Sequence, residues 1–316
     1  MKEEVNKNQT IQDIVNEVSK AIIGKNSIIL RVLLAILAGG HILIEDIPGV
    51  GKTTMAIAFS KALNLGYSRV QFTPDILPSD ITGFSVFDKE TGSMNFTPGA
   101  VMCNLFLADE LNRATSRTQS ALLEAMEEGQ VTVDGVSHTI DQPFIVIATQ
   151  NPAGAAGTQL LPDSQMDRFM VRVTLGYPSH EYELVLLERK RGVNLLDLVE
   201  PILTQEQLLQ MQKEVDSVYL HPEIIDYIVK ITGKTRDHPD ILLGASPRAS
   251  LALASMAKAM AYSQGRDYVT PDDIYRIVTE TLSHRIILRS GSENEEITKT
   301  SIVQNIVKSI NIPRVK

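Results

Sequence analysis

The chain has 316 residues, enough for one large domain or two ordinary ones with a substantial hydrophobic core. Hydrophobic residues make up 43% of it and charged residues 22%, a balance that excludes intrinsic disorder. The net charge of −8 argues against a duplex-binding surface, and the single cysteine, Cys103, excludes an intrachain disulfide framework and fits a reducing cytosol. We therefore expect a cytoplasmic globular protein.

The N-terminal region predicts neither a signal peptide nor a membrane span. It begins polar and becomes amphipathic, with no apolar stretch before a small-residue cleavage site. The most apolar part, 28–44, is interrupted by Arg31 and by Gly39-Gly40, so it is too short to cross a bilayer. It predicts a buried helix followed by a buried strand.

The segment 41–54, HILIEDIPGVGKTT, predicts a strand, a phosphate-binding loop and a helix in that order. Backbone N–H groups of such a loop point at phosphate oxygens, and the helix N-terminus adds positive potential. Lys52 would reach the β- and γ-phosphates, and the Thr53 hydroxyl would ligate Mg²⁺. The strict motif has glycine where this chain has Asp46, but aspartate tolerates left-handed backbone better than most residues. The alternative is an ordinary strand-to-helix turn with an exposed lysine.

Five short apolar runs alternate with helical segments in the first part of the chain. Runs of this kind, apolar on both faces, indicate a parallel sheet covered on both sides. The predicted strands are Ile42–Ile44, Arg69–Phe72, Asn104–Asp109, Phe144–Thr149 and Phe169–Leu175.

Two excursions from this sheet are predicted to be hairpins. The segment Gln130–Ile140 carries Asp134-Gly135 between alternating residues, which is a strong hairpin signal, and it follows an amphipathic helix at Thr118–Glu128. The Gly-containing segment Gly83–Ala100 is predicted to project in the same way.

The composition changes near Gly192, which is expected to end a helix. Beyond it no strand run is apparent, and helix starts recur at Thr204, Ser246 and Thr270. We therefore expect an α/β domain over 1–192 and a small all-helical domain over 193–316.

Two adjacent acids, Asp109 and Glu110, end a buried strand, the position where α/β sheets bind ligands. Asp109 is predicted to hold Mg²⁺ and Glu110 to activate the attacking water for γ-phosphate hydrolysis. The alternative is two solvated acids. Asn151 ends another buried strand, where its amide can contact the γ-phosphate or the water; the alternative is a turn-forming Asn-Pro.

Two arginines are candidate phosphate ligands. Arg168 precedes a strand and offers a planar fork of donors, with a surface salt bridge to Asp163 or Asp167 as the alternative. Arg248 lies in the first turn of a helix capped by Ser246, where the helix dipole disfavours a cation. An anionic partner would explain it, and so would a structural ion pair.

With these residues in order, the chain resembles the AAA+ ATPases, and among them the MoxR family, over nearly its whole length. The segments that carry the resemblance are AIIGKNSII near the adenine site, EDIPGVGKTT as Walker A, LADELNRA as Walker B, ATQNP as sensor 1, LPDSQMDRF as the arginine-finger region and GASPRAS as sensor 2. Asp46 in place of glycine matches a habit of that family. The excursion Gly83–Ala100 is similar to the helix-2 insert of that clade, and Gln130–Ile140 to its pre-sensor hairpin.

The resemblance implies a P-loop NTPase αβα sandwich with a parallel five-stranded sheet, followed by an α-helical lid. It implies ATP and Mg²⁺ as ligands, with Thr53 and Asp109 at the metal and with Glu110, Asn151, Arg168 and Arg248 as catalytic residues. The residues implied around the nucleotide are Ile23, Gly24, Pro48, Gly49, Val50, Gly51, Lys52, Thr53 and Thr54.

The family also implies a homo-oligomeric ring, usually a hexamer. Arg168 would come from the neighbouring subunit, with Arg113 and Arg117 as alternatives, whereas Arg248 would act within its own subunit. The implied function is chaperone-like remodelling of partner proteins, often von Willebrand A-domain proteins, in metal-centre maturation. The alternatives are a nucleic-acid motor, which the acidic charge disfavours, and a non-hydrolysing nucleotide switch.

Overall fold

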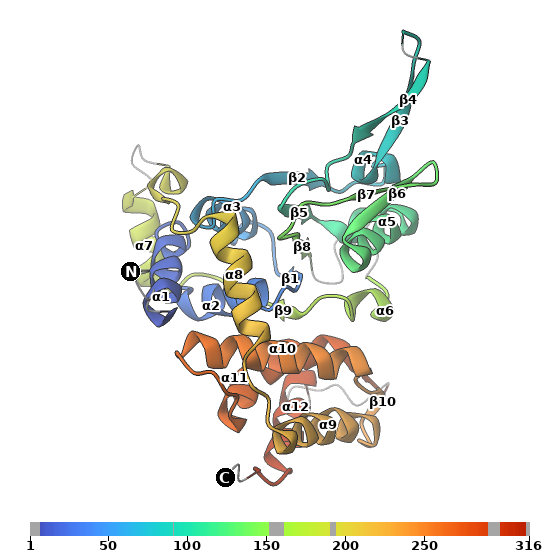
Figure 1. The fold of residues 1–316 in the computed structure, drawn as a ribbon. Coiled ribbons are helices and arrows are strands. Elements are labelled where there is room, and N and C mark those ends of the chain that lie inside the picture. The colour runs from blue at the N-terminus through green and yellow to red at the C-terminus, as the bar shows by residue number, and fades with distance from the viewer. Residues whose placement is uncertain (1–6, 91, 152–160, 190–193, 290–297, 314–316) are drawn as a thin grey trace, which may run out of the picture.

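A parallel five-stranded sheet forms the centre of the computed structural model, which describes residues 7–90, 92–151, 161–189, 194–289 and 298–313 (Figure 1). The strand order is β2-β5-β8-β1-β9, and every neighbouring pair is parallel. The strands are β1 (Ile42–Glu45), β2 (Tyr67–Gln71), β5 (Leu105–Asp109), β8 (Ile145–Gln150) and β9 (Val171–Val173). All five predicted runs are confirmed. Because the strands are parallel, their C-terminal ends share one side of the sheet, the carboxyl edge, and their N-terminal ends share the opposite side, the amino edge.

Apolar side chains alternate between the two faces of the sheet, and helices cover both. Ile42 and Ile44 belong to one core cluster, whereas Leu43 between them belongs to the other. The first cluster includes residues of α1 (Lys7–Ser19), α2 (Asn26–Leu37) and α3 (Lys52–Ala62), and the second residues of α4 (Pro78–Thr82) and α5 (Ser116–Glu128). The predicted αβα sandwich is confirmed.

Both predicted hairpins are present. The turn of β6 (Gln130–Val133) and β7 (Val136–Thr139) has Asp134 and Gly135 at positive φ, as a tight hairpin requires. The other hairpin, β3 (Gly83–Asp88) with β4 (Ser93–Pro98), projects from the body of the molecule (Figure 1). The two hairpins touch through Phe96 and His138, whose rings stack at 3.7 Å between centroids.

The C-terminal part is a helical lid that packs on the first domain through α10, which contacts α1 and α2. Its helices are α8 (Gln205–Asp216), α9 (Pro222–Arg236), α10 (Pro247–Ser263), α11 (Pro271–Leu282) and α12 (Lys299–Lys308). One short ladder, β10 (Ile241–Leu243) with β11 (Ile287–Leu288), was not predicted, because strands this short show no alternating pattern. The predicted boundary at 192/193 lies outside the described residues.

The described residues also contain several shorter elements. These are α6 (Asp163–Met166), α7 (His180–Arg189) and the 3₁₀ turns Leu111–Arg113, Leu195–Leu198 and Ser283–Arg285. In the described residues, no helix is both long and apolar enough to cross a membrane.

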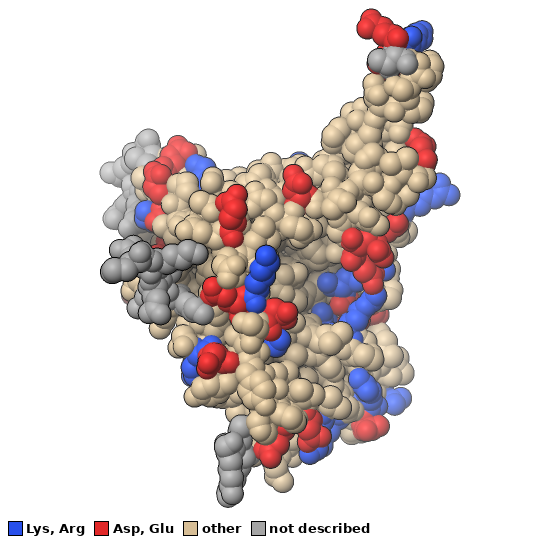
Figure 2. Space-filling view, viewed as in Figure 1, with Lys and Arg blue, Asp and Glu red and all other residues tan. Residues whose placement is uncertain are grey.

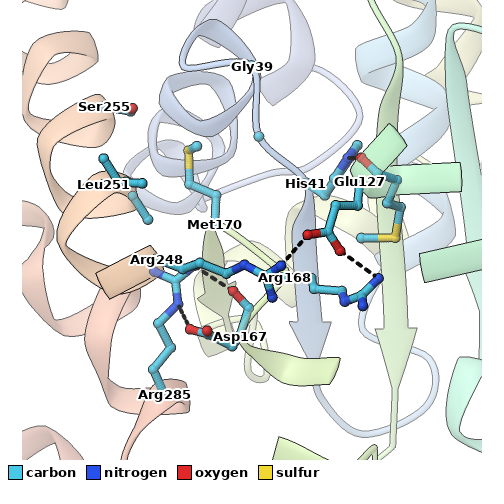
Figure 3. Close-up of a pocket in the computed structure, with 13 residues that line it drawn as sticks. Gly39, His41, Glu127, Asp167, Arg168, Met170, Arg248, Leu251, Ser255 and Arg285 are labelled. Carbon is cyan, nitrogen blue, oxygen red and sulfur yellow. Dashed lines mark hydrogen bonds and ion pairs between the residues drawn. The ribbon is translucent and has the colours of Figure 1, made fainter. Parts of the chain in front are cut away.

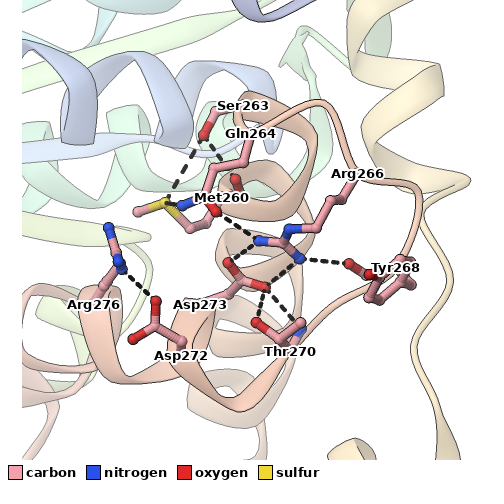
Figure 4. Close-up of polar contacts among 9 residues, drawn as sticks. All are labelled: Met260, Ser263, Gln264, Arg266, Tyr268, Thr270, Asp272, Asp273 and Arg276. Carbon is pink, nitrogen blue, oxygen red and sulfur yellow. Dashed lines mark hydrogen bonds and ion pairs between the residues drawn. The ribbon is translucent and has the colours of Figure 1, made fainter.

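A buried ion pair fixes the connection from α10 to α11 (Figure 4). Arg266 donates both Nη atoms to the fully buried carboxylate of Asp273, at 2.9 and 2.5 Å. Oδ2 of Asp273 also accepts the Thr270 N–H at 2.7 Å, which satisfies the start of α11. The hydrogen bond to Asp273 raises the pKa of Arg266 above its usual value. These bonds hold the loop between α10 and α11 against the first turn of α11, which begins where Thr270 predicted a helix start.

Candidate functional site

The loop after β1 has the backbone geometry of a phosphate cradle. Gly49 and Gly51 have φ values of +86° and +98°, which would strain a residue with a Cβ. Gly51 is the N-cap of α3, and no side chain caps that helix. The first backbone N–H groups of α3 are therefore left for a ligand, in the positive potential of the helix N-terminus.

Asp46 does not take the left-handed conformation that the sequence argument invoked, since it is not among the residues with positive φ. Its buried carboxylate instead ties the loop to its surroundings. Oδ1 accepts the Ile47 N–H at 2.8 Å, and Oδ2 accepts the Gly176 N–H, beyond β9, at 2.6 Å. The aspartate therefore serves as an anchor between the phosphate loop and the segment that leads to α7.

Lys52 is buried at the carboxyl edge and points at the end of β8. Its Nζ donates to the backbone oxygen of Asp46 at 2.6 Å and to Oδ1 of Asn151 at 2.9 Å. Burial lowers the pKa of Lys52, and the carboxylates of Asp46, Asp109 and Glu110 oppose that shift. The sequence-predicted lysine and amide are thus in direct contact, although 99 residues separate them.

Asp109 and Thr53 bring together oxygen donors of the kind that Mg²⁺ prefers. Thr53 Oγ1 lies 3.3 Å from Asp109 Oδ2, while Oδ1 accepts the Thr149 hydroxyl at 2.7 Å. In the described parts of the chain, no group of three or more His, Cys, Asp and Glu side chains could hold a metal alone. The residues therefore fit an ion that arrives with phosphate oxygens and water as its other ligands, as Mg²⁺ does in nucleotide sites.

Glu110 occupies a strained backbone conformation beside Asp109. Its φ of +57° and ψ of +43° lie in the left-handed region, which is uncommon outside glycine. The Glu110 N–H donates to Thr149 Oγ1 at 2.8 Å, and this bond helps to hold the turn. The carboxylate accepts from Asn151 Nδ2 at 3.2 Å and pairs with Arg113 Nη1 at 2.9 Å. Its two partners hold the predicted base in a defined position.

The predicted adenine residues lie next to the phosphate loop. The Ile22 side chain is 3.4 Å from the Cβ position of Gly51, so the segment after α1 runs beside the loop. Ile23 and Gly24 line a cavity together with Tyr182 of α7, whose ring packs against Gly24. Gly24 has a φ of +75°, and a Cβ there would meet the tyrosine ring at 2.4 Å. The close approach of this ring explains the glycine.

Arg168 and Arg248 share one carboxylate, that of Glu127 at the end of α5 (Figure 3). Arg168 Nη1 lies 3.0 Å from Glu127 Oε2 and donates to the Leu123 carbonyl at 2.7 Å. Arg248 binds the other carboxylate oxygen of Glu127. An ion pair was the alternative for both arginines. For Arg168 the expected partner was Asp163 or Asp167, but the carboxylate that it contacts is that of Glu127.

Asp167 has other partners. It accepts the Ser246 hydroxyl at 2.7 Å and pairs with Arg285 at 3.0 Å.

Both arginines lie at the amino edge, away from the phosphate loop. They line a cavity with Gly40 and His41, which precede β1, whereas the loop follows β1. Four strand residues span about 13 Å, so the two edges are separate sites. The fold places Arg248 beside Arg168 and not beside its own phosphate loop. Its predicted action on its own subunit's nucleotide stays a prediction. Of the alternative fingers, Arg113 pairs with Glu110 of its own chain and Arg117 is exposed on α5.

His41, which precedes β1, links β8 to α5 beside this amino-edge cluster. Nδ1 accepts the Val146 N–H at 3.0 Å, which leaves Nε2–H to donate to the Met126 carbonyl at 3.0 Å. Burial lowers the pKa of His41 to about 4. The ring is thus neutral near pH 7 and fixes the backbone next to Glu127.

Three residues with direct contacts to the predicted site were not singled out from the sequence: Thr149, Glu127 and Arg69. Thr149 bonds both the Asp109 carboxylate and the Glu110 N–H, and Arg69 pairs with Asp109 at 2.7 Å. Thr149 is the last residue of a predicted strand and lies two positions before Asn151, so its strand-end position was a usable signal. No local pattern marks Glu127 or Arg69.

Known families match both parts of this arrangement. The model described as "ATPase family associated with various cellular activities (AAA)" matches residues 41–171, and that of the AAA lid domain matches 233–306. Chaperone MoxR1 of Mycobacterium tuberculosis is 35% identical over 315 residues, which cover 97% of this chain and 83% of that protein. The chain belongs to the MoxR family of AAA+ ATPases.

Further relatives agree with this assignment. The MoxR-family chain is 44% identical over 299 residues to the uncharacterized protein YeaC of Bacillus subtilis, a match that covers 95% of this chain and 93% of that protein. It also resembles the crystal structure of a candidate ATPase from Cytophaga hutchinsonii, with a TM-score of 0.89 and 38% identity over 98% of this chain and 96% of that one.

Proposed function

We propose that this MoxR-family protein hydrolyses ATP with Mg²⁺ in sites shared between subunits of a homo-hexameric ring, and uses the cycle to remodel partner proteins in the cytoplasm. The observation that carries the proposal is the separation of charges between the two edges. The carboxyl edge holds the phosphate loop, Lys52, Asp109 and Glu110, whereas Arg168 and Arg248 lie at the amino edge. A site completed by a neighbouring subunit's arginines would use both edges.

In the proposed cycle, phosphate oxygens replace Asn151 and the Asp46 carbonyl as partners of Lys52. Thr53 and Asp109 would hold Mg²⁺, which neutralises charge on the phosphates when it is bound. Glu110, oriented by Asn151 Nδ2, takes a proton from the water that attacks the γ-phosphate. The strained backbone of Glu110 keeps its carboxylate at the end of β5, where this water would lie.

Arg168 and Arg248 would stabilise the transition-state charge in the adjoining subunit's site. An arginine supplied in this way contributes about 10³ to 10⁵ in rate in other NTPases. Because Glu127 holds both guanidinium groups, they are presented together. The neighbour's phosphates would then compete with Glu127 for the same donors.

Mixing of two inactive variants tests the shared site. Arg168→Ala retains an intact carboxyl edge, and Lys52→Ala retains an intact amino edge. In mixed rings, an Arg168→Ala subunit next to a Lys52→Ala subunit regains a complete site, so ATPase activity should reappear on mixing. Activity that stays absent at every mixing ratio, although the variants co-assemble, would contradict the shared site. Arg248→Ala in place of Arg168→Ala should give the same rescue, whereas an arginine that acts within its own subunit would give none.

The relative named Chaperone MoxR1 supports the proposed remodelling role, and the β3–β4 hairpin supplies a suitable surface. Phe84, Val86, Phe87 and Met94 of this hairpin are each about half exposed, and Figure 2 shows little charge on it away from the tip. Von Willebrand A-domain proteins are the clients we propose to test first. A client should stimulate ATP turnover, and duplex DNA should not; stimulation by DNA alone would favour a nucleic-acid motor.

A further inference from the structure

Arg69 forms an ion pair with Asp109, the carboxylate that is proposed to bind Mg²⁺. It lies on β2, the edge strand next to β5, and its Nη2 is 2.7 Å from Asp109 Oδ2. The carboxylate of Asp109 is 10% exposed, whereas the arginine side chain is 41% exposed. A mostly buried anion is therefore neutralised by a cation that has a path to solvent.

Arg69 binds the carboxylate oxygen that the metal would also use. Asp109 Oδ1 is taken by the Thr149 hydroxyl, so Oδ2 is the oxygen that faces Thr53, the other predicted metal ligand. Arg69 binds this same Oδ2. A divalent cation beside Thr53 and the guanidinium of Arg69 would repel each other across one carboxylate oxygen.

We propose that Arg69 competes with Mg²⁺ for Asp109 and so sets the magnesium affinity of the nucleotide site. This inference rests on the proposed function, since the metal arrives with the nucleotide. While Arg69 is bound, Asp109 is neutralised without metal, and binding of the metal weakens or breaks the Arg69–Asp109 pair. Loss of the arginine charge should therefore strengthen metal binding. An arginine that only supported the fold or the phosphates would not have this effect.

The test is Mn²⁺ binding, measured by electron paramagnetic resonance at saturating ADP, where no turnover occurs. Arg69→Gln should bind Mn²⁺ about five- to tenfold more tightly than the unmodified chain, the size expected for one partly exposed charge near a divalent ion. Arg69→Lys keeps the charge and should stay within about twofold of the unmodified chain. Thermal unfolding of each variant shows whether it is folded, and Arg69→Met, which also removes the charge, takes the place of Arg69→Gln should that variant fold poorly.

Arg113 provides a matched control. Its side chain is 40% exposed and pairs with the adjacent carboxylate, Glu110, which does not face Thr53 in this way. Arg113→Gln should change Mn²⁺ affinity less than Arg69→Gln. An equal gain in Mn²⁺ affinity in the two variants would mean that the loss of any nearby positive charge strengthens metal binding, and it would overturn the inference. Unchanged or weaker Mn²⁺ binding in Arg69→Gln would also overturn it. Loss of ADP binding in every sample would overturn the proposed function as well, whereas normal ADP binding with unaltered Mn²⁺ affinity would overturn this inference alone.

Discussion

The two edges of the sheet differ in how their charges are arranged. At the carboxyl edge, Lys52, Asp109 and Glu110 lie among hydrogen bonds from neighbouring strands. At the amino edge, Arg168 and Arg248 converge on one half-exposed glutamate, Glu127. The first edge has the polar groups that a phosphate and an attacking water would need, whereas the second presents two arginines that lie away from their own phosphate loop. Under the proposed function, the two edges are halves of one nucleotide site that a neighbouring subunit completes.

Loss of the base at the carboxyl edge should have the largest effect. Glu110→Gln removes proton acceptance but keeps the shape of the side chain and its hydrogen bonding to Asn151. We expect ATP turnover to fall by about 10² to 10⁴, the usual contribution of a general base, with nucleotide affinity little changed. Steady-state hydrolysis and equilibrium binding measure the two quantities. Undiminished hydrolysis would remove Glu110 from the mechanism.

Release of the arginines at the amino edge should have an intermediate effect. Glu127→Gln removes the charge that holds Arg168 and Arg248 together, and misplaced groups of this kind cost up to about 10²-fold in rate. We expect turnover to fall roughly tenfold, with ATP affinity unchanged because the subunit's own phosphate loop is intact. The neighbouring exposed residue offers a control, since Glu128→Gln removes the same charge one position away. Equal effects of the two substitutions would argue against a specific role for Glu127.

The smallest effect concerns the pH dependence of stability at the amino edge. The pKa of His41 is lowered to about 4, so between about pH 6.5 and pH 4 the unfolded chain binds a proton that the folded chain excludes. The contribution of His41 to the free energy of unfolding is therefore fully present above pH 6.5 and is lost as the pH falls from 6.5 to about 4. His41→Gln, which does not titrate, should lose less stability between pH 7 and pH 5 than the unmodified chain in denaturant titrations. Equal losses would indicate that His41 is not the titrating group.

The sequence predicted what depends on local patterns. The five strands, the Asp134-Gly135 turn and the helix start at Thr204 follow from residues adjacent in the chain, and all are present. The polar ends of β5 and β8 could be grouped in advance because parallel strands align their C-termini. The pairs Arg248–Glu127, Arg69–Asp109 and Asp46–Gly176 could not, since 40 to 130 residues separate the partners. Such pairs are set by packing, which carries no local signature.

The β3–β4 hairpin has a mechanical consequence. Six residues of each strand give it a length of about 20 Å, and its ladder is a two-stranded sheet of its own (Figure 1). Its base rests against α4 and β6, and the Phe96 ring stacks on His138 of β7. A rotation of about 10° at that base would displace the tip by roughly 3 Å over this length. Any rotation at its base is therefore carried to the exposed tip over the full length of the hairpin.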